Sequence, residues 1–368
     1  MTERPIILPL YARISLMIVA VIGVGFVLHV GKTVFIPFLF ALLLAILLNP
    51  LVNRLEALGC NRILAIAMVV VSAMLLLGGV AYFVVEQAMR FVSSMDGFKH
   101  NLLELSDSMK AWLQGKLGME HEQMEAIEGE MVEQSEAKGA AVVKNTLTTV
   151  GAMFTFFFLL PVCAFLFILY KRLLLGFIAQ LFSKRRHNTV QEVLTGAQGV
   201  IQGYLLGLLL EALIVAALNV GGLWLIGVEY ALLLGVLGAL LNTVPYIGGL
   251  IATGLAMMVA LATLEPSAAV WVLLLFLVVQ FVDNNFIVPR IVASRLQVNA
   301  LVAFAVVLWG GAFWGVAGMF LAIPFTAIIK VICDRIPGLQ PLGYLLGDQQ
   351  RTIRGSMLKL RKQRTPNS

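Results

Sequence analysis

Charged residues are scarce in this sequence. Only 12% of its 368 residues are charged, whereas ordinary globular domains carry about 25%. The hydrophobic fraction is 60%, which is more apolar surface than a soluble fold of this length can bury. The composition therefore excludes a soluble globular protein. It predicts an all-α polytopic membrane protein that has the lipid bilayer as its solvent.

Cysteine and histidine are also rare. The three cysteines, Cys60, Cys163 and Cys333, are far apart and form no CxxC pair, and the four histidines are equally scattered. The phosphate-binding motif of ATP-driven pumps is missing, and so are the HExxH and GxSxG motifs of hydrolases. We therefore expect no metal site, no cofactor and no enzymatic activity.

Long runs with few ionisable residues mark the expected membrane segments, because about 20 apolar residues are needed to cross a hydrocarbon core of about 30 Å. The first run is expected to stay in the mature protein, since no signal-peptide cleavage site follows it. The fifth and sixth runs each contain one acidic residue. The six runs cover residues 14–31, 33–53, 63–85, 145–170, 200–228 and 266–288.

Two further apolar intervals, residues 230–264 and 296–329, are too long for one crossing and short for two crossings with a turn. Both contain proline or glycine near the middle, at Asn242–Gly249 and at Trp309–Gly315. A re-entrant hairpin fits this length, and a pair of short tilted helices is the alternative. In total we expect about eight membrane segments, two of them re-entrant hairpins.

Lysine and arginine gather at two places, which sets the expected orientation in the bacterial inner membrane. Residues 171–199 carry five basic residues against one acidic, and the tail from Lys330 carries eight against two. Both regions, and with them both termini, are expected in the cytoplasm. Residues 86–144 carry eleven acidic and six basic residues and are expected in the periplasm.

The distribution of apolar and charged residues divides the chain into four parts. The periplasmic stretch has apolar residues at helical spacing, which predicts amphipathic helices that pack on themselves, act as a lid or contact another subunit. The basic tail is expected to lie on anionic lipid, and we expect no nucleic acid as a partner. The parts are three transmembrane helices (1–86), the amphipathic helical region (87–144), the transmembrane core (145–335) and the basic tail (336–368).

Polar residues inside the apolar segments are the candidates for a binding site, because an ionisable group there costs about 2.5 to 3.5 kcal/mol on insertion scales. Glu211 lies near the middle of its span, with Gln202 and Asn219 about two turns to either side. Its carboxyl group could couple transport to a proton or a cation. The alternative is a neutral acid that is hydrogen-bonded to a neighbouring helix.

A second candidate site is formed by Asp283, Asn284 and Asn285, followed by Pro289 and Arg290. The proline is expected to end the helix. The three consecutive oxygen-bearing side chains could coordinate a small cation or bind a polar solute. An interfacial polar cluster is the alternative.

The third candidate is the tip of the first expected hairpin, from Asn242 through Pro245 and Tyr246 to Gly248 and Gly249. Broken helices near the membrane midplane are where secondary transporters place their binding sites. A simple tight turn is the alternative.

These motifs occur in an order that resembles the autoinducer-2 exporter family, a group of bacterial permease-like proteins, over nearly the whole chain. One departure is Gln297, where many relatives place a proline. The motifs are Pro37-Phe-Leu-Phe-Ala41 with Asn49-Pro50, Val244-Pro-Tyr-Ile-Gly-Gly249, Asp283-Asn284 with Pro289-Arg290, and Gly310-Gly311 with Gly315-Val-Ala-Gly318 and Ala322-Ile-Pro324.

The resemblance implies about eight membrane segments and homo-oligomers, with pentamers suggested for the family. It also implies export of a small polar signalling molecule such as autoinducer-2 in some members and sodium or lithium/proton antiport in others. We therefore expect a secondary transporter that exports such a molecule. A cation/proton antiporter is one alternative, and a membrane scaffold that holds a periplasmic partner through residues 87–140 is the other.

Overall fold

The computed structural model describes residues 9–93, 156–243, 248–292 and 298–347. Across these ranges every regular element is a helix, and the only β-type pairing is an isolated bridge between Val298 and Gly347. This confirms the predicted all-α membrane fold. Within the described ranges, six helices are long and apolar enough to cross a membrane, or seven if the bent pair Phe156–Leu169 and Lys171–Gln180 is one span. Most of the predicted insertion and the end of the tail lie outside the described residues.

The helices follow the predicted apolar runs, although several extend beyond them. The third helix continues to Ser93, and the fourth run bends by 64° near Tyr170. In chain order the described elements are α1 (Leu10–Val30), α2 (Lys32–Ala57), α3 (Arg62–Ser93), Phe156–Leu169, α6 (Lys171–Gln180), the 3-10 turn η1 (Lys184–Arg186), α7 (His187–Ile226), α8 (Ala231–Asn242), α9 (Gly248–Thr263), α10 (Pro266–Val282), the π-helix η2 (Asp283–Val292), α12 (Ala300–Arg335) and α13 (Gln340–Leu346).

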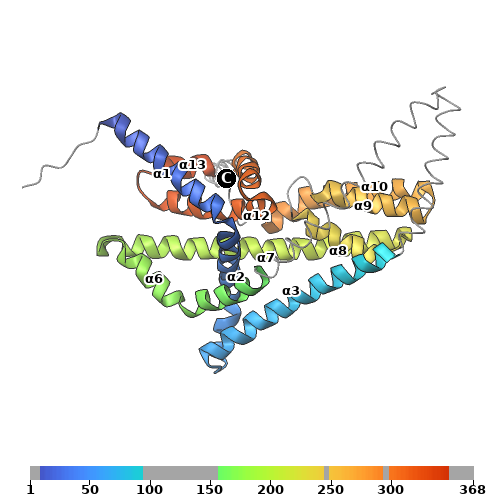
Figure 1. Cartoon of the computed structure of the whole chain (residues 1–368), viewed down its shortest axis with the longest axis horizontal. Coiled ribbons are helices and arrows are strands. Elements are labelled where there is room, and N and C mark those ends of the chain that lie inside the picture. Colours follow the sequence, from blue (N-terminus) through green and yellow to red (C-terminus); the bar gives the residue numbers. More distant parts are fainter. Residues whose placement is uncertain (1–8, 94–155, 244–247, 293–297, 348–368) are drawn as a thin grey trace, which may run out of the picture.

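Helix α7 is the axis of the molecule (Figure 1). Its 40 residues make it about 60 Å long. It begins after the basic turn η1 and ends at Gly227, whose positive φ of 84° closes the helix with a left-handed cap. The helices α2, α8, α10, α12 and η2 all contact it. Side chains on α7 are therefore well placed to meet residues from most of the other helices.

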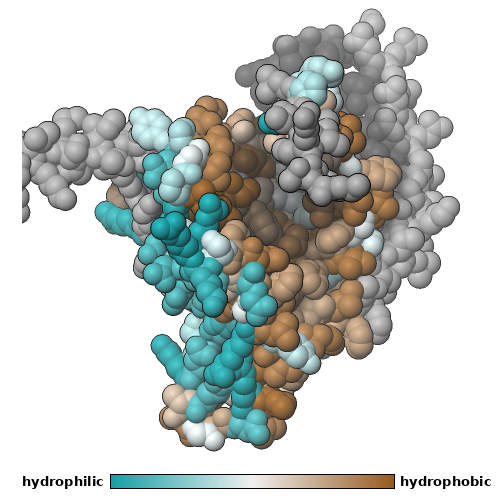
Figure 2. Space-filling view, turned by 90° about the vertical axis from the view of Figure 1, so that its left-hand side faces the viewer, coloured by the Kyte–Doolittle hydropathy of each residue, from teal (hydrophilic) through white to brown (hydrophobic). Residues whose placement is uncertain are grey.

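The two ends of α7 differ in polarity. The end beside α6 carries Lys184, Arg185 and Arg186, which are all exposed. Figure 2 shows a broad hydrophilic region next to apolar surface on this end of the molecule. The opposite end carries the α7–α8 and α9–α10 turns, which contain the exposed acids Glu229 and Glu265.

Both long apolar intervals form helical hairpins. Helices α8 and α9 contact each other and have 12 and 16 residues, so that at about 18 and 24 Å neither spans a hydrocarbon core of about 30 Å. Helix α12 is interrupted by non-helical backbone at Trp314 and Gly315. The chain folds back there, because Gly310 lies against the backbone of Gly318.

The prediction that Pro289 ends its helix was wrong. The chain continues from α10 into the π-helix η2, and Pro289 lies inside η2. In an α-helix a proline ring clashes with the carbonyl group four residues earlier. A π-helix pairs residues five apart, which displaces that carbonyl group and leaves room for the ring. Single π-helical turns are frequent at functional sites.

Among the described residues, the largest cluster of buried hydrophobic side chains surrounds the first hairpin. Leu223 of α7, Ala256 of α9 and Val272 of α10 are fully buried in one cluster. Alanine and glycine dominate the contact faces of α8 and α9, which allows the close helix approach that is typical of membrane proteins. By contrast, α1 buries none of its apolar window within the chain. This hairpin is therefore held firmly against α7 and α10.

Candidate functional site

One face of α7 carries two buried polar residues of the membrane core, Glu211 and Asn219. Gly207, Glu211, Val215 and Asn219 are buried and follow one another at intervals of four residues, so they lie on one face of the helix. Glu211 is only 8% exposed and Asn219 only 2%. This face therefore presents a carboxyl group and an amide to the neighbouring elements rather than to lipid.

The π-helix η2 packs directly on this face. A Cβ atom on Gly207 would lie 3.0 Å from the carbonyl oxygen of Ile291. About two turns further along α7, Val215 packs with Ile287 and Ile291. Glu211 lies between these two contacts. The wider helix thus places its first residue, Asp283, on the same side of α7 as Glu211, and Asp283 is 2% exposed.

A small cavity lies where this face of α7, the first hairpin and η2 meet. Its volume is about 10 Å³, which is close to the minimum needed to hold one water molecule. Residues from α7, α8, α9, α10 and η2 all contribute to its walls. They are Val215, Asn219, Gly238, Asn242, Gly249, Ala252, Phe276, Val279, Gln280 and Asp283.

Two oxygen atoms at this cavity have no hydrogen-bond partner among the described residues. They are Asn219 Oδ1 and Asp283 Oδ1, and both are buried. The other carboxylate oxygen of Asp283 accepts a hydrogen bond of 2.9 Å from Asn242 Nδ2. A buried polar atom without a partner costs about 1 to 3 kcal/mol. A group that donated hydrogen bonds to these two oxygens, or a cation beside them, would remove that cost.

Glycine brings further oxygen atoms close to the same point. A Cβ atom on Gly249 would lie 2.9 Å from Gln280 Oε1 and 3.9 Å from Asn242 Oδ1. On the other side, a Cβ atom on Gly238 would lie 3.2 Å from Asn219 Nδ2. The two glycines thus make room for amide side chains, whose oxygens are among the ligands that hard cations prefer.

The two carboxyl groups of this region interact. Asp283 acts electrostatically on Glu211, and Glu211 acts in turn on the buried Tyr204. Two like charges in a poorly hydrated site repel each other, and a proton or cation bound at either one relieves that repulsion. Among the described residues no group of three or more His, Cys, Asp or Glu side chains could hold a metal ion.

Some of the predicted site residues lie close together in the structure, and others lie apart from them. Asn242, Gly249 and Asp283 come together around the cavity. Glu211 does not line it, and lies about two turns from the lining residue Asn219 on the same buried face of α7. Gly248 is needed for close packing, because a Cβ atom there would overlap the backbone at Leu241 of α8.

The remaining predicted residues lie to the outside or beyond the described ranges. Asn284 is exposed and accepts a hydrogen bond from Gln280 Nε2, while Asn285 is exposed and donates to the carbonyl group of Phe281. Arg290 is exposed and lies over the ring of Phe286, and Pro289 is half-buried within η2. Pro245 and Tyr246 lie outside the described residues.

The sequence analysis did not select seven of the ten cavity residues, among them Asn219, Gly238 and Gln280. Asn219 lies eight residues from Glu211, which places it on the same face of α7, and Gln280 lies three residues before Asp283. Gly238 lies four residues before Asn242 on α8. In each case helical spacing from a selected residue is the signal that would have found the neighbour.

Comparison with known proteins agrees with this architecture. YrrI of Bacillus subtilis (strain 168), provisionally named as a transport protein, is 25% identical over 354 residues, covering 90% of this chain and 97% of YrrI. YhhT of Escherichia coli (strain K12), also provisionally named as a transport protein, is 28% identical over 328 residues, covering 87% of this chain and 90% of YhhT. The AI-2 transport protein TqsA of the same strain is 23% identical over 364 residues, covering 94% of this chain and 98% of TqsA.

The same relationship extends along most of the sequence. A sequence model of the AI-2E family transporters matches residues 14–338, a range that contains every described membrane helix from α2 to α12 and most of α1. The cavity residues of α7, the first hairpin and η2 all lie inside it. The chain therefore belongs to the AI-2E transporter family, and its role is in membrane transport.

Proposed function

We propose that this protein is a secondary transporter whose cargo and coupling site is the cavity between α7, the α8–α9 hairpin and η2. One observation carries the proposal: Asn219 Oδ1 and Asp283 Oδ1 are buried and unpartnered, and both residues line the same water-sized space. Half-length helices that meet near the membrane midplane are the usual setting for such sites in secondary transporters. A scaffold protein would gain nothing from these two oxygens.

The two carboxyl groups provide a means of coupling. A proton or a cation at Asp283 relieves its repulsion with Glu211, and the two occupants compete for the same negative charge. Binding of one therefore favours release of the other. This competition is the basis of an exchange mechanism, in which the protein changes its access side only when the charge is neutralised.

The cargo that fits the described cavity best is a desolvated monovalent cation of the size of sodium or lithium. A volume of about 10 Å³ accepts an object about as large as one water molecule. Carboxylate and amide oxygens replace the hydration shell of such an ion, as they do in channels and transporters. Sodium or lithium/proton antiport is therefore the function that the geometry supports best.

Export of a small polar signalling molecule is the second candidate. It is favoured by the similarity to the AI-2 transport protein TqsA, which extends over 94% of this chain. The hydrogen-bonding groups of Asn219, Asn242 and Gln280 could bind the hydroxyl groups of such a molecule. The cavity would first have to widen, which requires the hairpin tip at Gly249 to move away from Gln280.

For orientation we propose the bacterial inner membrane with both termini in the cytoplasm. The exposed basic residues of η1 lie at one end of α7, and the acidic turns lie at the other. Basic residues favour the cytoplasmic side. The insertion that follows α3 then begins at the periplasmic side. A homo-oligomer stays a prediction.

The proposal is tested with purified full-length protein in liposomes that contain a pH-sensitive dye. Sodium, lithium and potassium gradients are applied in turn. We expect proton movement with sodium or lithium and little with potassium. The Glu211→Gln variant should lose this movement, and Glu192→Gln, which changes an exposed carboxyl group on the same helix, should keep it.

Two results separate the candidates. Proton movement that is the same for all three cations, or that persists in Glu211→Gln, contradicts antiport at this site. Liposomes loaded with autoinducer-2 provide the second arm. Release of that molecule without any cation-driven proton movement would favour the export function over antiport.

A further inference from the structure

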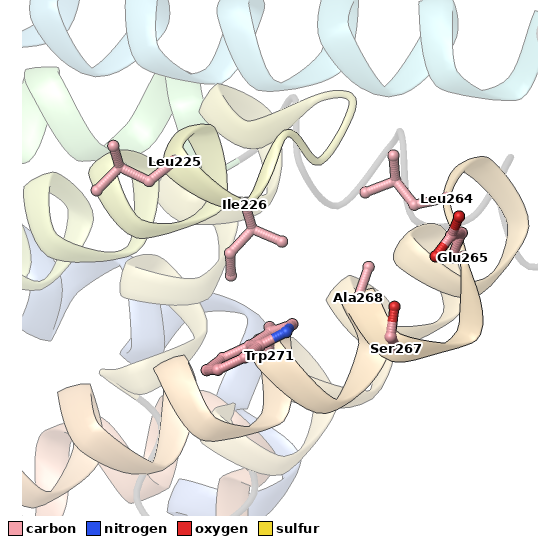
Figure 3. Close-up of a pocket in the computed structure, with 7 residues that line it drawn as sticks. All are labelled: Leu225, Ile226, Leu264, Glu265, Ser267, Ala268 and Trp271. Atoms are coloured by element: carbon pink, nitrogen blue, oxygen red, sulfur yellow. The ribbon is translucent and has the colours of Figure 1, made fainter.

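A second, much larger pocket lies at the opposite end of α10 from the proposed cargo site. Its volume is about 540 Å³. Its walls come from the end of α7 and from the turn between α9 and α10, and in Figure 3 the indole of Trp271 lies below Ile226 and between the two groups of residues. The lining residues are Leu225, Ile226, Leu264, Glu265, Ser267, Ala268 and Trp271.

This pocket is separate from the cargo site. Glu265 and Asp283 are 18 residues apart along one continuous span, which corresponds to about 27 Å. The fully buried residues Leu223, Ala256 and Val272 fill the space between the three helices along this distance. The pocket is therefore not a vestibule that leads to the cavity.

The surroundings of the pocket are those of a membrane interface. It lies where apolar helices end, and Trp224 and Trp271 are both largely exposed there. Tryptophan gathers at the level of the lipid headgroups, because its ring is apolar and its N–H group is polar. Leu225 is 80% exposed beside them. The apolar wall thus faces lipid tails, and the polar rim faces the headgroup layer.

The polar rim combines the Glu265 carboxylate with the N-terminus of α10, where the helix dipole has its positive end. Glu265 is exposed, and its carboxylate makes no capping hydrogen bond to α10 and no ion pair with any described residue. Ser267 adds a hydroxyl group in the first turn of α10. The N–H groups of a first helical turn have no acceptor within the helix and attract anions. A ligand with one cationic and one anionic group matches this rim.

We propose that this pocket binds a membrane phospholipid with a zwitterionic headgroup that ends in a primary ammonium, namely phosphatidylethanolamine. The ammonium lies at the Glu265 carboxylate, and the phosphate lies at Ser267 and the first turn of α10. The acyl chains follow Leu225, Ile226 and the Trp271 ring. A primary ammonium donates hydrogen bonds to a carboxylate, whereas the trimethylated ammonium of phosphatidylcholine cannot.

The test is native mass spectrometry of the full-length protein in detergent. Phosphatidylethanolamine, phosphatidylcholine and phosphatidylglycerol with identical acyl chains are added separately. We expect phosphatidylethanolamine to bind about fivefold more tightly than phosphatidylcholine, since an exposed charge pair contributes at most about that factor. Phosphatidylglycerol should bind more weakly than phosphatidylethanolamine, because its net negative charge faces Glu265.

Two variants assign the preference to the pocket. Glu265→Gln should bind phosphatidylethanolamine and phosphatidylcholine equally, whereas Glu229→Gln, in the neighbouring α7–α8 turn, should keep the preference. Trp271→Ala should weaken the binding of both lipids, because it removes apolar wall without changing the charge. Equal binding of the two lipids to the unsubstituted protein, or a preference that survives Glu265→Gln, overturns the proposal.

Discussion

The two helical hairpins of this protein have the same architecture and opposite chemistry. The α8–α9 hairpin ends beside a carboxylate and several amides, and its tip is part of a small polar cavity. The hairpin within α12 turns at Trp314 and Gly315, where aromatic rings and backbone groups meet each other. Both use glycine for close approach.

Polar groups at the turn of the second hairpin find hydrogen-bond partners on α1. Trp314 Nε1 donates to the carbonyl group of Leu28, and His29 Nδ1 lies 3.2 Å from the carbonyl oxygen of Phe313. The ring of Phe40 stacks on Phe320 with 5.3 Å between centroids. The comparison teaches that a break in a membrane helix is not by itself a binding site. Unpartnered side-chain oxygens at the break are what distinguish the first hairpin.

The largest expected effect is a loss of folding when the second hairpin is overpacked. A side chain in Gly318→Val would overlap the backbone of Gly310, and we expect a cost of about 3 kcal/mol or more. Thermal unfolding in detergent measures it. Gly23→Val in α1 is the control, because no atom lies near its Cβ position. Equal stability of the two variants would show that the two arms of α12 do not touch.

The next effect separates stability from transport at the first hairpin. Asn219→Leu removes an unpartnered buried oxygen and should raise the free energy of unfolding by about 1 kcal/mol. The same change should lower cation-driven proton flux about tenfold, the equivalent of about 1.4 kcal/mol of binding. Thermal unfolding and the liposome assay measure the two quantities. A variant that is less stable and transports normally would contradict this role for Asn219.

A smaller effect should follow from narrowing the cavity. In Gly249→Ala the new methyl group would lie 2.9 Å from Gln280 Oε1, so the amide has to move toward the space that holds the cargo. We expect sodium flux to fall about fivefold and lithium flux to fall less, because lithium is the smaller ion. Competition between the two ions in the liposome assay measures the ratio. An unchanged ratio would place the cargo elsewhere.

The smallest effect concerns the tip of the second hairpin. Trp314→Phe keeps an aromatic ring and loses the hydrogen bond to Leu28, which should lower the free energy of unfolding by about 1 kcal/mol. Transport should be unchanged. A loss of flux with normal stability would mean that the second hairpin also takes part in transport, and the contrast between the hairpins would fail.

Much of the fold could be predicted, because the bilayer imposes a simple length rule. Runs of apolar residues predicted α1, α2, α3, α7 and α10, and the unusual length of two intervals predicted the two hairpins. The helix ends were less predictable. The third helix runs on to Ser93, since a helix does not have to stop where the hydrocarbon ends.

The π-helix could not be predicted from the sequence. Hydrophobic periodicity does not distinguish pairing over four residues from pairing over five, and Pro289 signals the end of an α-helix. The candidate site was found in part. Glu211, Asn242 and Asp283 could be selected because they are charged or lie within a polar group. Asn219 and Gln280 are single amides in apolar helices, and only the structure shows that both line the same cavity.

The central claim is that the carboxylate beside the first hairpin carries transport, and the Asp283→Asn variant tests it most directly. Sodium-driven proton flux is measured in liposomes, with thermal unfolding as a check on folding and Glu229→Gln as the control for loss of an exposed carboxylate. We expect Asp283→Asn to fold normally and to lose the flux, while the control keeps it. Flux equal to that of the unsubstituted protein in well-folded Asp283→Asn would contradict the account.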